Sequence, residues 1–252
     1  MPRQKPFKVL LIGDGCTDEY IYGVCERLNP EAPVPVFKPL RSVRRKGMAW
    51  NVRENLMSFG IEVYIMTNIE DIIKIRYIDE KHNQQLLRVD EEKPVSPMEY
   101  ELPKGKYDAM VISDYDKGFI TPEKLCELVE WFKGPVFIDS KKDDLPVRRG
   151  CFIKINQYEY DKLKKKDEQN VIVTRGGDGT YHGGVYYPTE KVNVFDIVGA
   201  GDTFLATLTY FYLLYRDIRK SIPYANSAAT IAVTHRGTYI LTKEDVEQIK
   251  SK

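Results

Sequence analysis

The stretch Asp196-Ile197-Val198-Gly199-Ala200-Gly201-Asp202-Thr203-Phe204 places two glycines, an alanine and a carboxylate directly before a run of apolar residues. That run, residues 203–215, has the length and composition of a buried helix. Glycine lets a backbone turn tightly and approach a ligand, and the first turn of a helix has free N–H groups that attract anions. An aspartate there is placed to take a proton from a hydroxyl beside the anion, which predicts phosphoryl transfer to an alcohol. The alternative is a Gly-rich turn in which Asp202 only caps the helix.

The composition is that of an ordinary globular protein of 252 residues, with 42% hydrophobic and 30% charged residues. A chain of this length forms one large α/β domain or two small ones. The net charge of +1 gives no reason to expect nucleic acid or an anionic membrane as a partner. Residues 1–8 lack the apolar core of a signal peptide, and the four cysteines lack a C-x-x-C spacing. We therefore expect a cytoplasmic protein with free thiols and no membrane-spanning segment.

Apolar segments that end at turn residues alternate with segments of helical periodicity along the chain. This alternation predicts a mostly parallel sheet with helices on both faces. Ligands of such sheets bind outside the carboxyl ends of the strands, where the sequence places Asp14, Asp114, Asp139, Asn156 and Arg175. The expected strands are residues 8–12, 62–66, 109–113, 135–139, 152–155 and 171–174, and the expected helices are residues 51–59, 122–132, 157–164, 203–215 and 222–233.

Two further pairs of segments mix polar with apolar residues, as exposed strands do. They predict a small sheet that projects from the main body, with its strands within residues 17–40 and 74–90. The expected strands are residues 20–22 and 34–38 around a Pro-rich turn, and residues 74–78 and 85–90 around a polar turn.

Four motifs in the second half resemble those of the ribokinase-like (PfkB-type) sugar kinases. Residues 194–204 resemble the signature D-T-x-G-A-G-D, and Asn156-Gln157-Tyr158-Glu159 matches the motif N-x-x-E. Residues 174–179 match the nucleotide loop T-x-G-x-x-G, and residues 226–229 resemble the late helix that borders the adenine in this family. The resemblance implies a single ribokinase-like domain over residues 1–252, a three-layer α/β/α fold with a small β-sheet lid.

Motifs in the first half narrow the resemblance to kinases of D-glycero-β-D-manno-heptose 7-phosphate. These motifs are Gly13-Asp14, residues 29–36 (Asn-Pro-Glu-Ala-Pro-Val-Pro-Val), residues 83–90 (Asn-Gln-Gln-Leu-Leu-Arg-Val-Asp), residues 113–118 and Asp139-Ser140-Lys141. Such kinases transfer the γ-phosphoryl group of ATP to the anomeric hydroxyl of the heptose. The resemblance therefore implies ATP and Mg²⁺ as cofactors, a sugar phosphate as substrate and a homodimer formed through the lid.

The resemblance also implies roles for individual residues. Asp202 would be the base, and the N–H groups of Gly199, Ala200 and Gly201 would form an anion hole. The remaining residues divide by ligand: Asn156, Thr174, Gly176, Gly179 and Asn226 would bind the nucleotide, Glu159 and Asn156 would organise Mg²⁺ through water, and Asp14, Gly47, Asn51, Arg88 and Lys117 would bind the sugar phosphate, with Lys141 as a further cation near phosphate.

Plainer interpretations stand beside these roles. Asn156 alone would cap a helix that begins at residue 157, with Glu159 as a solvated charge in its first turn. Asp14 alone would be a turn residue, and Arg88 would form a surface ion pair. The alternative functions are a kinase for another sugar or a nucleoside, and a non-catalytic binding protein on a kinase scaffold.

The chain departs from the family pattern at three places. The motif G-G-A-A-N is replaced by Gly47-Met48-Ala49-Trp50-Asn51, so a bulky side chain stands at a glycine position. Ile197 replaces a threonine, which removes a hydroxyl near the phosphates. Only residues 67–73 separate Met66 from Lys74, where related kinases have at least another helix and strand, so we expect one edge of the sheet to be trimmed.

Overall fold

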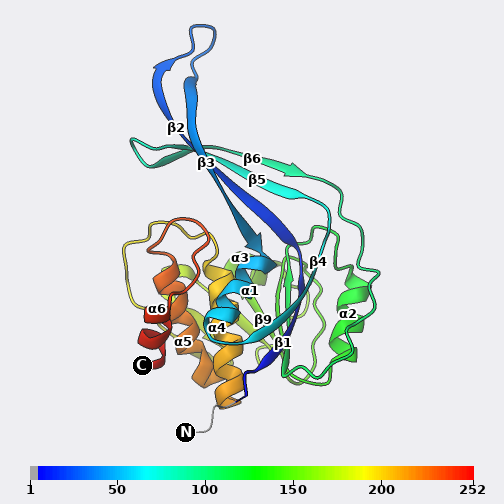
Figure 1. Cartoon of the computed structure of the whole chain (residues 1–252). Coiled ribbons are helices and arrows are strands. Elements are labelled where there is room, and N and C mark those ends of the chain that lie inside the picture. The colour runs from blue at the N-terminus through cyan, green and yellow to red at the C-terminus, as the bar shows by residue number, and fades with distance from the viewer. Residues whose placement is uncertain (1–4) are drawn as a thin grey trace.

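The computed structural model describes residues 5–252, which form two sheets (Figure 1). The larger sheet has the strand order β12-β11-β10-β9-β8-β7-β1-β4, and its strands from β10 to β4 are parallel. This confirms the prediction of a mostly parallel central sheet. Its strands are β1 (Lys8–Gly13), β4 (Glu62–Thr67), β7 (Ala109–Asp114), β8 (Val136–Ser140), β9 (Cys151–Asn156), β10 (Val171–Thr174), β11 (Thr180–His182) and β12 (Val185–Tyr187).

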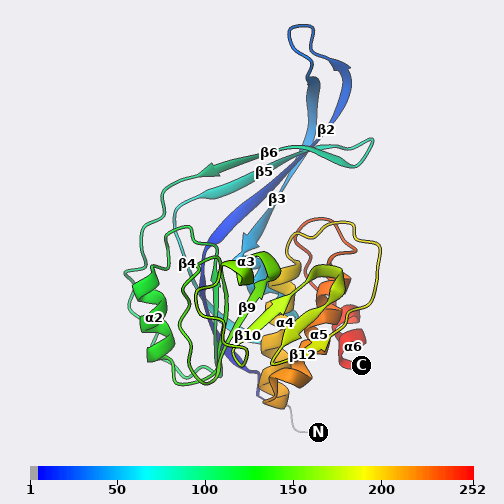
Figure 2. The same cartoon turned by 180° about the vertical axis from the view of Figure 1, so that it is seen from behind.

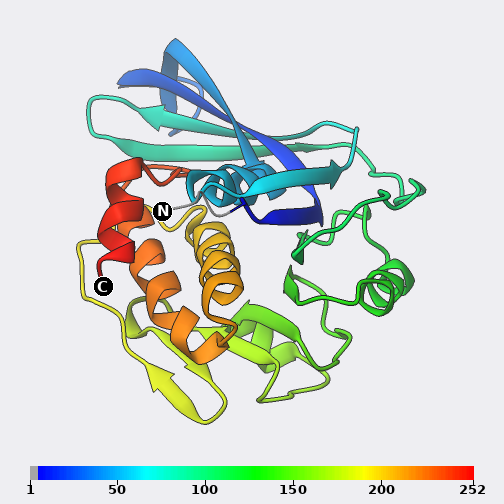
Figure 3. The same cartoon turned by 60° about the horizontal axis from the view of Figure 1, so that its bottom comes forward.

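Helices cover both faces of this sheet, because successive side chains of each strand point to opposite faces. Val9 and Leu11 of β1 pack in a cluster with α1, α4 and α5, whereas Leu10 and Ile12 pack in a cluster with α2. Figure 3 shows α1, α4 and α5 gathered along one side of the sheet. The three-layer α/β/α prediction is therefore confirmed. The helices are α1 (Ala49–Ser58), α2 (Pro122–Trp131), α3 (Gln157–Lys162), α4 (Ala200–Tyr215), α5 (Ile218–Ala232) and α6 (Lys243–Lys250).

The helix ends explain where the predicted ranges differ from the observed ones. α4 begins at Ala200, within the Gly-rich stretch, because Gly199 before it adopts φ 80°. α5 begins at Ile218, because Asp217 accepts hydrogen bonds from the N–H groups of residues 219 and 220. α6 was absent from the prediction, although Thr242 and Asp245 form a capping box at its start.

The smaller sheet is the lid, which stands away from the body in Figures 1 and 2. Its order is β3-β2-β5-β6, and its strands run beyond the expected ranges, with β3 continuing to Met48. Most side chains of β3 are exposed, so no apolar alternation marked its length. Its strands are β2 (Gly15–Leu28), β3 (Pro35–Met48), β5 (Ile72–Asp79) and β6 (Gln84–Glu92).

The short connection at residues 67–73 leaves β4 at the edge of the larger sheet. Between β4 and β5, residues 68–71 form neither helix nor strand, so the chain passes from the sheet edge directly into the lid. Among the helices of residues 5–252, none combines the length and apolar character needed to cross a bilayer. The four cysteines are free, as predicted.

Candidate active site

Asp202 lies in the first turn of α4, and the loop before it is held by Asp196. The Asp196 carboxylate accepts hydrogen bonds from the N–H groups of Val198 (3.0 Å) and Gly237 (2.9 Å). Gly199 has φ 80°, and a Cβ there would lie 2.7 Å from Nδ2 of Asn51. Only glycine satisfies both constraints, so this turn places Asp202 beside Asn51.

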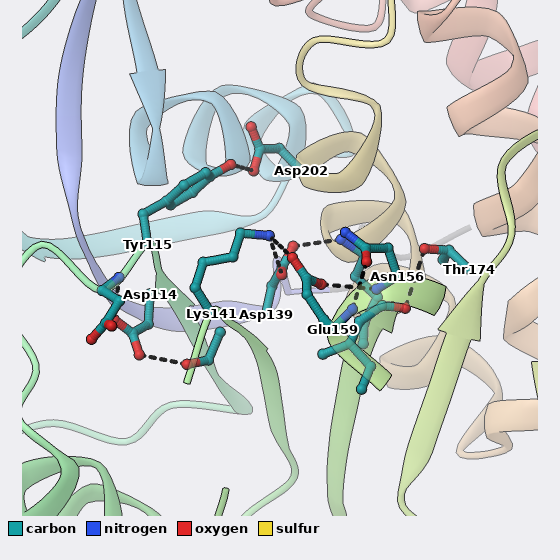
Figure 4. Close-up of polar contacts among 12 residues, drawn as sticks. Asp114, Tyr115, Asp139, Lys141, Asn156, Glu159, Thr174 and Asp202 are labelled. Carbon is teal, nitrogen blue, oxygen red and sulfur yellow. Dashed lines mark hydrogen bonds and ion pairs between the residues drawn. The ribbon is translucent and has the colours of Figure 1, made fainter. Parts of the chain in front are cut away.

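The Asp202 carboxylate is only 3% exposed and is held by two side chains from other segments. Asn51 donates from Nδ2 to Oδ2 (3.0 Å), and the Tyr115 hydroxyl donates to Oδ1 (2.9 Å; Figure 4). Burial raises the pKa of Asp202 to about 6; the bonds from Asn51 and Tyr115 oppose this rise, and the charge of Asp139 adds to it. A carboxylate with such a pKa is suited to general-base catalysis near neutral pH.

Four predicted nucleotide residues, Thr174, Gly176, Gly179 and Asn226, line one cavity of about 200 Å³. Ala200 and Gly201 line the same cavity, so the start of α4 borders it. The Asn226 amide is already engaged, because Oδ1 accepts from the Thr180 hydroxyl (2.6 Å) and Nδ2 donates to the Tyr187 carbonyl (3.0 Å). The prediction missed the apolar part of the wall, formed by Val194, Ile197, Phe204 and Val233.

The predicted anion hole is only partly free. The Ala200 N–H donates to the Ile197 carbonyl (3.3 Å), which closes the turn. Gly201 faces Lys154 of β9, and a Cβ on Gly201 would lie 2.6 Å from Nζ of that lysine. The start of α4 therefore combines a helix N-terminus with a buried cation.

Asn156 and Glu159 form a capping box at the start of α3 (Figure 4). The Asn156 side chain accepts from the Glu159 N–H (2.9 Å), and Oε2 of Glu159 accepts from the Asn156 N–H (2.9 Å). The other carboxylate oxygen of Glu159 accepts from the Lys141 ammonium. The capping role named as the plainer interpretation is present here, and it fixes the Glu159 carboxylate next to Lys141.

Asp139 and Lys154 form a buried ion pair that sequence reasoning missed, with Nζ 2.5 Å from Oδ2 of Asp139. Oδ1 of Asp139 has no hydrogen-bond partner among the described residues, and Nζ of Lys141 lies 3.9 Å from it. The available signal was a lysine inside the apolar run 151–155, because a charge in a buried strand needs a partner.

Asp14 is buried at the end of β1, and its Oδ2 accepts from the N–H groups of Tyr115 (2.7 Å) and Lys117 (3.4 Å). Its Oδ1 has no partner among the described residues. Burial raises the pKa of Asp14 to about 6, and the nearby charge of Asp114 adds to the rise. Asp14 therefore stabilises a turn, as the plainer interpretation predicted. Its Oδ1 remains available to accept a further hydrogen bond.

Three predicted sugar-phosphate residues are engaged elsewhere. Arg88 forms a two-bond pair with Asp90 (2.6 Å each), and Nζ of Lys117 contacts Glu92 (2.6 Å). Gly47 packs so closely on Asp18 that a Cβ would collide with its carboxylate. The structure brings Asn51 to Asp202, whereas Arg88 and Lys117 are paired with Asp90 and Glu92 of β6.

Comparisons with known proteins agree with this geometry. The pfkB family carbohydrate kinase pattern matches residues 157–245. The bifunctional protein HldE of a Nitratiruptor species is 29% identical over 297 residues, which cover 96% of this chain and 64% of the relative. HldE of Campylobacter jejuni (strain RM1221) is 30% identical over 307 residues, which cover 100% of this chain and 66% of the relative. The chain thus spans 64% and 66% of the lengths of these curated relatives.

Solved structures share the fold at low identity. Ribokinase of Thermotoga maritima superposes with a TM-score of 0.69 at 14% identity, covering 98% of this chain and 100% of that chain. Arabidopsis thaliana ribokinase complexed with ribose and ATP gives 0.68 at 13% identity, covering 97% and 99%. The alignment with the C. jejuni relative is longer than the 252 residues of this chain, so the relative has additional residues within the aligned region. The matched pattern, the relatives aligned along the chain and the shared fold show that the chain belongs to the PfkB family of carbohydrate kinases.

Proposed function

We propose that the chain transfers the γ-phosphoryl group of ATP to a hydroxyl of a sugar phosphate. The observation that carries this proposal is the position of Asp202, a buried carboxylate at the N-terminus of α4 whose neighbours Ala200 and Gly201 line a cavity. In this proposal Asp202 acts as the base, and the N-terminus of the same helix faces the phosphates. Phosphoryl transfer needs both, because the acceptor loses a proton while charge spreads over the moving group.

ATP would occupy the cavity of about 200 Å³ beside α4. The turn at Gly176–Gly179 brings backbone close to this space, and the apolar wall suits a base ring. The solved ribokinase of A. thaliana is described with ATP and ribose, which supports the same pairing of ligands here.

The acceptor we propose is D-glycero-β-D-manno-heptose 7-phosphate at its anomeric hydroxyl. The motif resemblance in the first half and the HldE relatives support this choice. The unpaired Oδ1 of Asp14 and the amide of Asn51 would hold sugar hydroxyls. Asp202 would then take the proton of the reacting hydroxyl, a contribution of about 10²–10⁴-fold. For Arg88 and Lys117 to bind the substrate phosphate, they would leave Asp90 and Glu92.

The residues near Asn156 fit a magnesium ion, because Mg²⁺ takes oxygen ligands and keeps several waters. Glu159 and the unpaired Oδ1 of Asp139 supply carboxylate oxygens, and both now lie next to the Lys141 ammonium. Mg²⁺ bound there would offset the charge of the phosphates. Asn156 would act through water, since its side-chain oxygen already caps α3.

The decisive experiment measures ADP formation by the purified chain with and without heptose 7-phosphate, beside a panel of hexose and pentose phosphates and nucleosides. We expect ADP to form only with an acceptor, and fastest with the heptose. Faster turnover of another acceptor would show that the heptose phosphate is not the preferred substrate, while the proposal that the chain is a kinase would stand. Nucleotide binding without turnover of any acceptor would favour the non-catalytic scaffold instead.

We also propose a homodimer formed through the lid. The β2–β3 arm extends beyond β5 and β6 (Figure 2) and exposes Leu28, Val34 and Leu40. Exposed apolar residues on a protruding sheet are typical of an interaction surface. Light scattering during gel filtration should give twice the chain mass, and Leu40→Glu should shift the mass to the monomer. A monomeric mass at high concentration would contradict this proposal.

A further inference from the structure

Met48 occupies a backbone conformation that favours glycine. It has φ 57° and ψ −128°, and it lies where β3 ends and α1 begins. A Cβ makes this conformation costly, so it persists only where the surroundings impose it. The Met48 side chain is also only 3% exposed, which shows that the strained residue is packed rather than projecting into solvent.

The Met48 side chain belongs to a buried cluster with Cys16 and Ile72, and Tyr115 packs against that cluster. The Tyr115 hydroxyl donates to Asp202 (2.9 Å). Asn51, one turn further along α1, donates to the other oxygen of the same carboxylate (3.0 Å). Met48 therefore shares a buried cluster with Cys16 of β2 and Ile72 of β5, against which Tyr115 packs, and it precedes Asn51 by three residues.

We propose that Met48 determines specificity by limiting the size of the acceptor that can reach Asp202. This inference rests on the proposed function, since it assumes that the acceptor enters between the lid and the base. A thioether side chain at a glycine position removes space from that compartment. In an apolar pocket one methylene group changes discrimination by about 10–200-fold, so removing the Met48 side chain should favour large acceptors over small ones.

The test is equilibrium binding of heptose 7-phosphate and a pentose 5-phosphate, by calorimetry without ATP, to the wild-type chain, Met48→Gly and Met48→Ala. Both variants should raise the affinity ratio of heptose to pentose phosphate by about tenfold. An unchanged ratio in both variants overturns the proposal, and so does a failure of either sugar phosphate to bind any of the three proteins. Binding without ADP formation would reject phosphoryl transfer and leave the Met48 result standing, so the two failures are distinguishable.

Thermal melting separates the backbone effect from the effect of bulk. Met48→Gly should melt at a higher temperature than Met48→Ala, because only glycine relieves the positive φ. Met57, within α1, is a matched control, since it is 43% exposed and its φ is not positive. There the order should reverse, with Met57→Ala above Met57→Gly, and neither control should change the affinity ratio. Equal melting of the two Met48 variants overturns the assignment of strain.

Discussion

The surroundings of Asp202 differ on its two sides: one side borders a cavity, and the other is packed with side chains. On the side where we propose that the nucleotide binds, a glycine turn at residues 176–179 and an apolar wall border a cavity of about 200 Å³. On the side where we propose that the acceptor binds, Cys16 and Met48 are buried in one cluster and Tyr115 packs against it. A ligand can enter the cavity as it stands, whereas the packed side chains have to move before a ligand can bind between them. From the proposed function we therefore expect nucleotide affinity and acceptor selectivity to depend on separate residues, so that a single change affects one without the other.

The largest expected effect comes from the residue that the two sides share. Asp202→Asn should lower turnover by about 10²–10⁴-fold, because the amide cannot accept the proton. Nucleotide affinity should change little, because the cavity is lined by other residues. Coupled ADP assays and nucleotide titration check the two halves of this prediction. Asp143→Asn, at a surface pair with Lys164, is the control and should keep full turnover. A variant with normal turnover would remove Asp202 from the role of base.

The buried ion pair of Asp139 and Lys154 should contribute to the stability of the fold. Lys154→Met should destabilise the fold by about 3–5 kcal/mol, because it leaves Asp139 buried without its cation. Urea denaturation measures the change. Lys8→Met removes an exposed partner of Glu62 and should cost about 1 kcal/mol or less. Equal losses of unfolding free energy in the two variants would mean that the buried pair stabilises the fold no more than the exposed one.

On the acceptor side, Asp14 should make stability depend on pH. Its folded pKa of about 6 lies above the ordinary value of 3.8, so the folded state binds a proton more readily and its stability falls as pH rises through this range. The interval of about two pH units corresponds to roughly 3 kcal/mol. Asp14→Asn should therefore gain stability relative to the wild type at pH 8 compared with pH 4, in urea denaturation at both values. Asp71→Asn, at an exposed residue, should show no such difference.

The smallest expected effect is that of Tyr115→Phe, which should change the pKa of Asp202 without changing nucleotide affinity. Tyr115→Phe removes a hydrogen bond that lowers the pKa of Asp202, so that pKa should rise and the acidic limb of the pH–rate profile should move to higher pH. Nucleotide affinity should stay unchanged, because Tyr115 is not in the cavity wall. Tyr100→Phe, at an exposed tyrosine, is the control. A shift toward lower pH would contradict the assigned hydrogen bond.

The same division explains what the sequence could predict. The apolar runs at residues 8–12 and 109–113 and the glycines at 176, 179 and 201 carry local signals, so the parallel sheet and the glycine part of the cavity wall were predicted, whereas its apolar part was not. Tyr115 and Asp202 lie far apart in sequence, and their hydrogen bond depends on the packed fold. Arg88 and Lys117 looked available for phosphate, but their pairing with Asp90 and Glu92 depends on strand register and lid position.

Asn156 shows a third case, in which one residue satisfies two interpretations. Its cap on α3 follows from local spacing, and the same cap fixes Glu159 next to Lys141. The ligand role and the structural role of such a residue cannot be separated by a motif, because both require the same side chain at the same place.

The direct fusion of β3 to α1 has a mechanical consequence. The lid strand ends at Met48, and the helix that follows carries Asn51, whose amide donates a hydrogen bond to Asp202. A tilt of the β2–β3 arm about this junction would turn α1. Because Asn51 follows Met48 by only three residues, the same tilt would move the Asp202 carboxylate that Asn51 holds. In the function we propose, closure over the sugar and alignment of the proton acceptor would thus be a single movement.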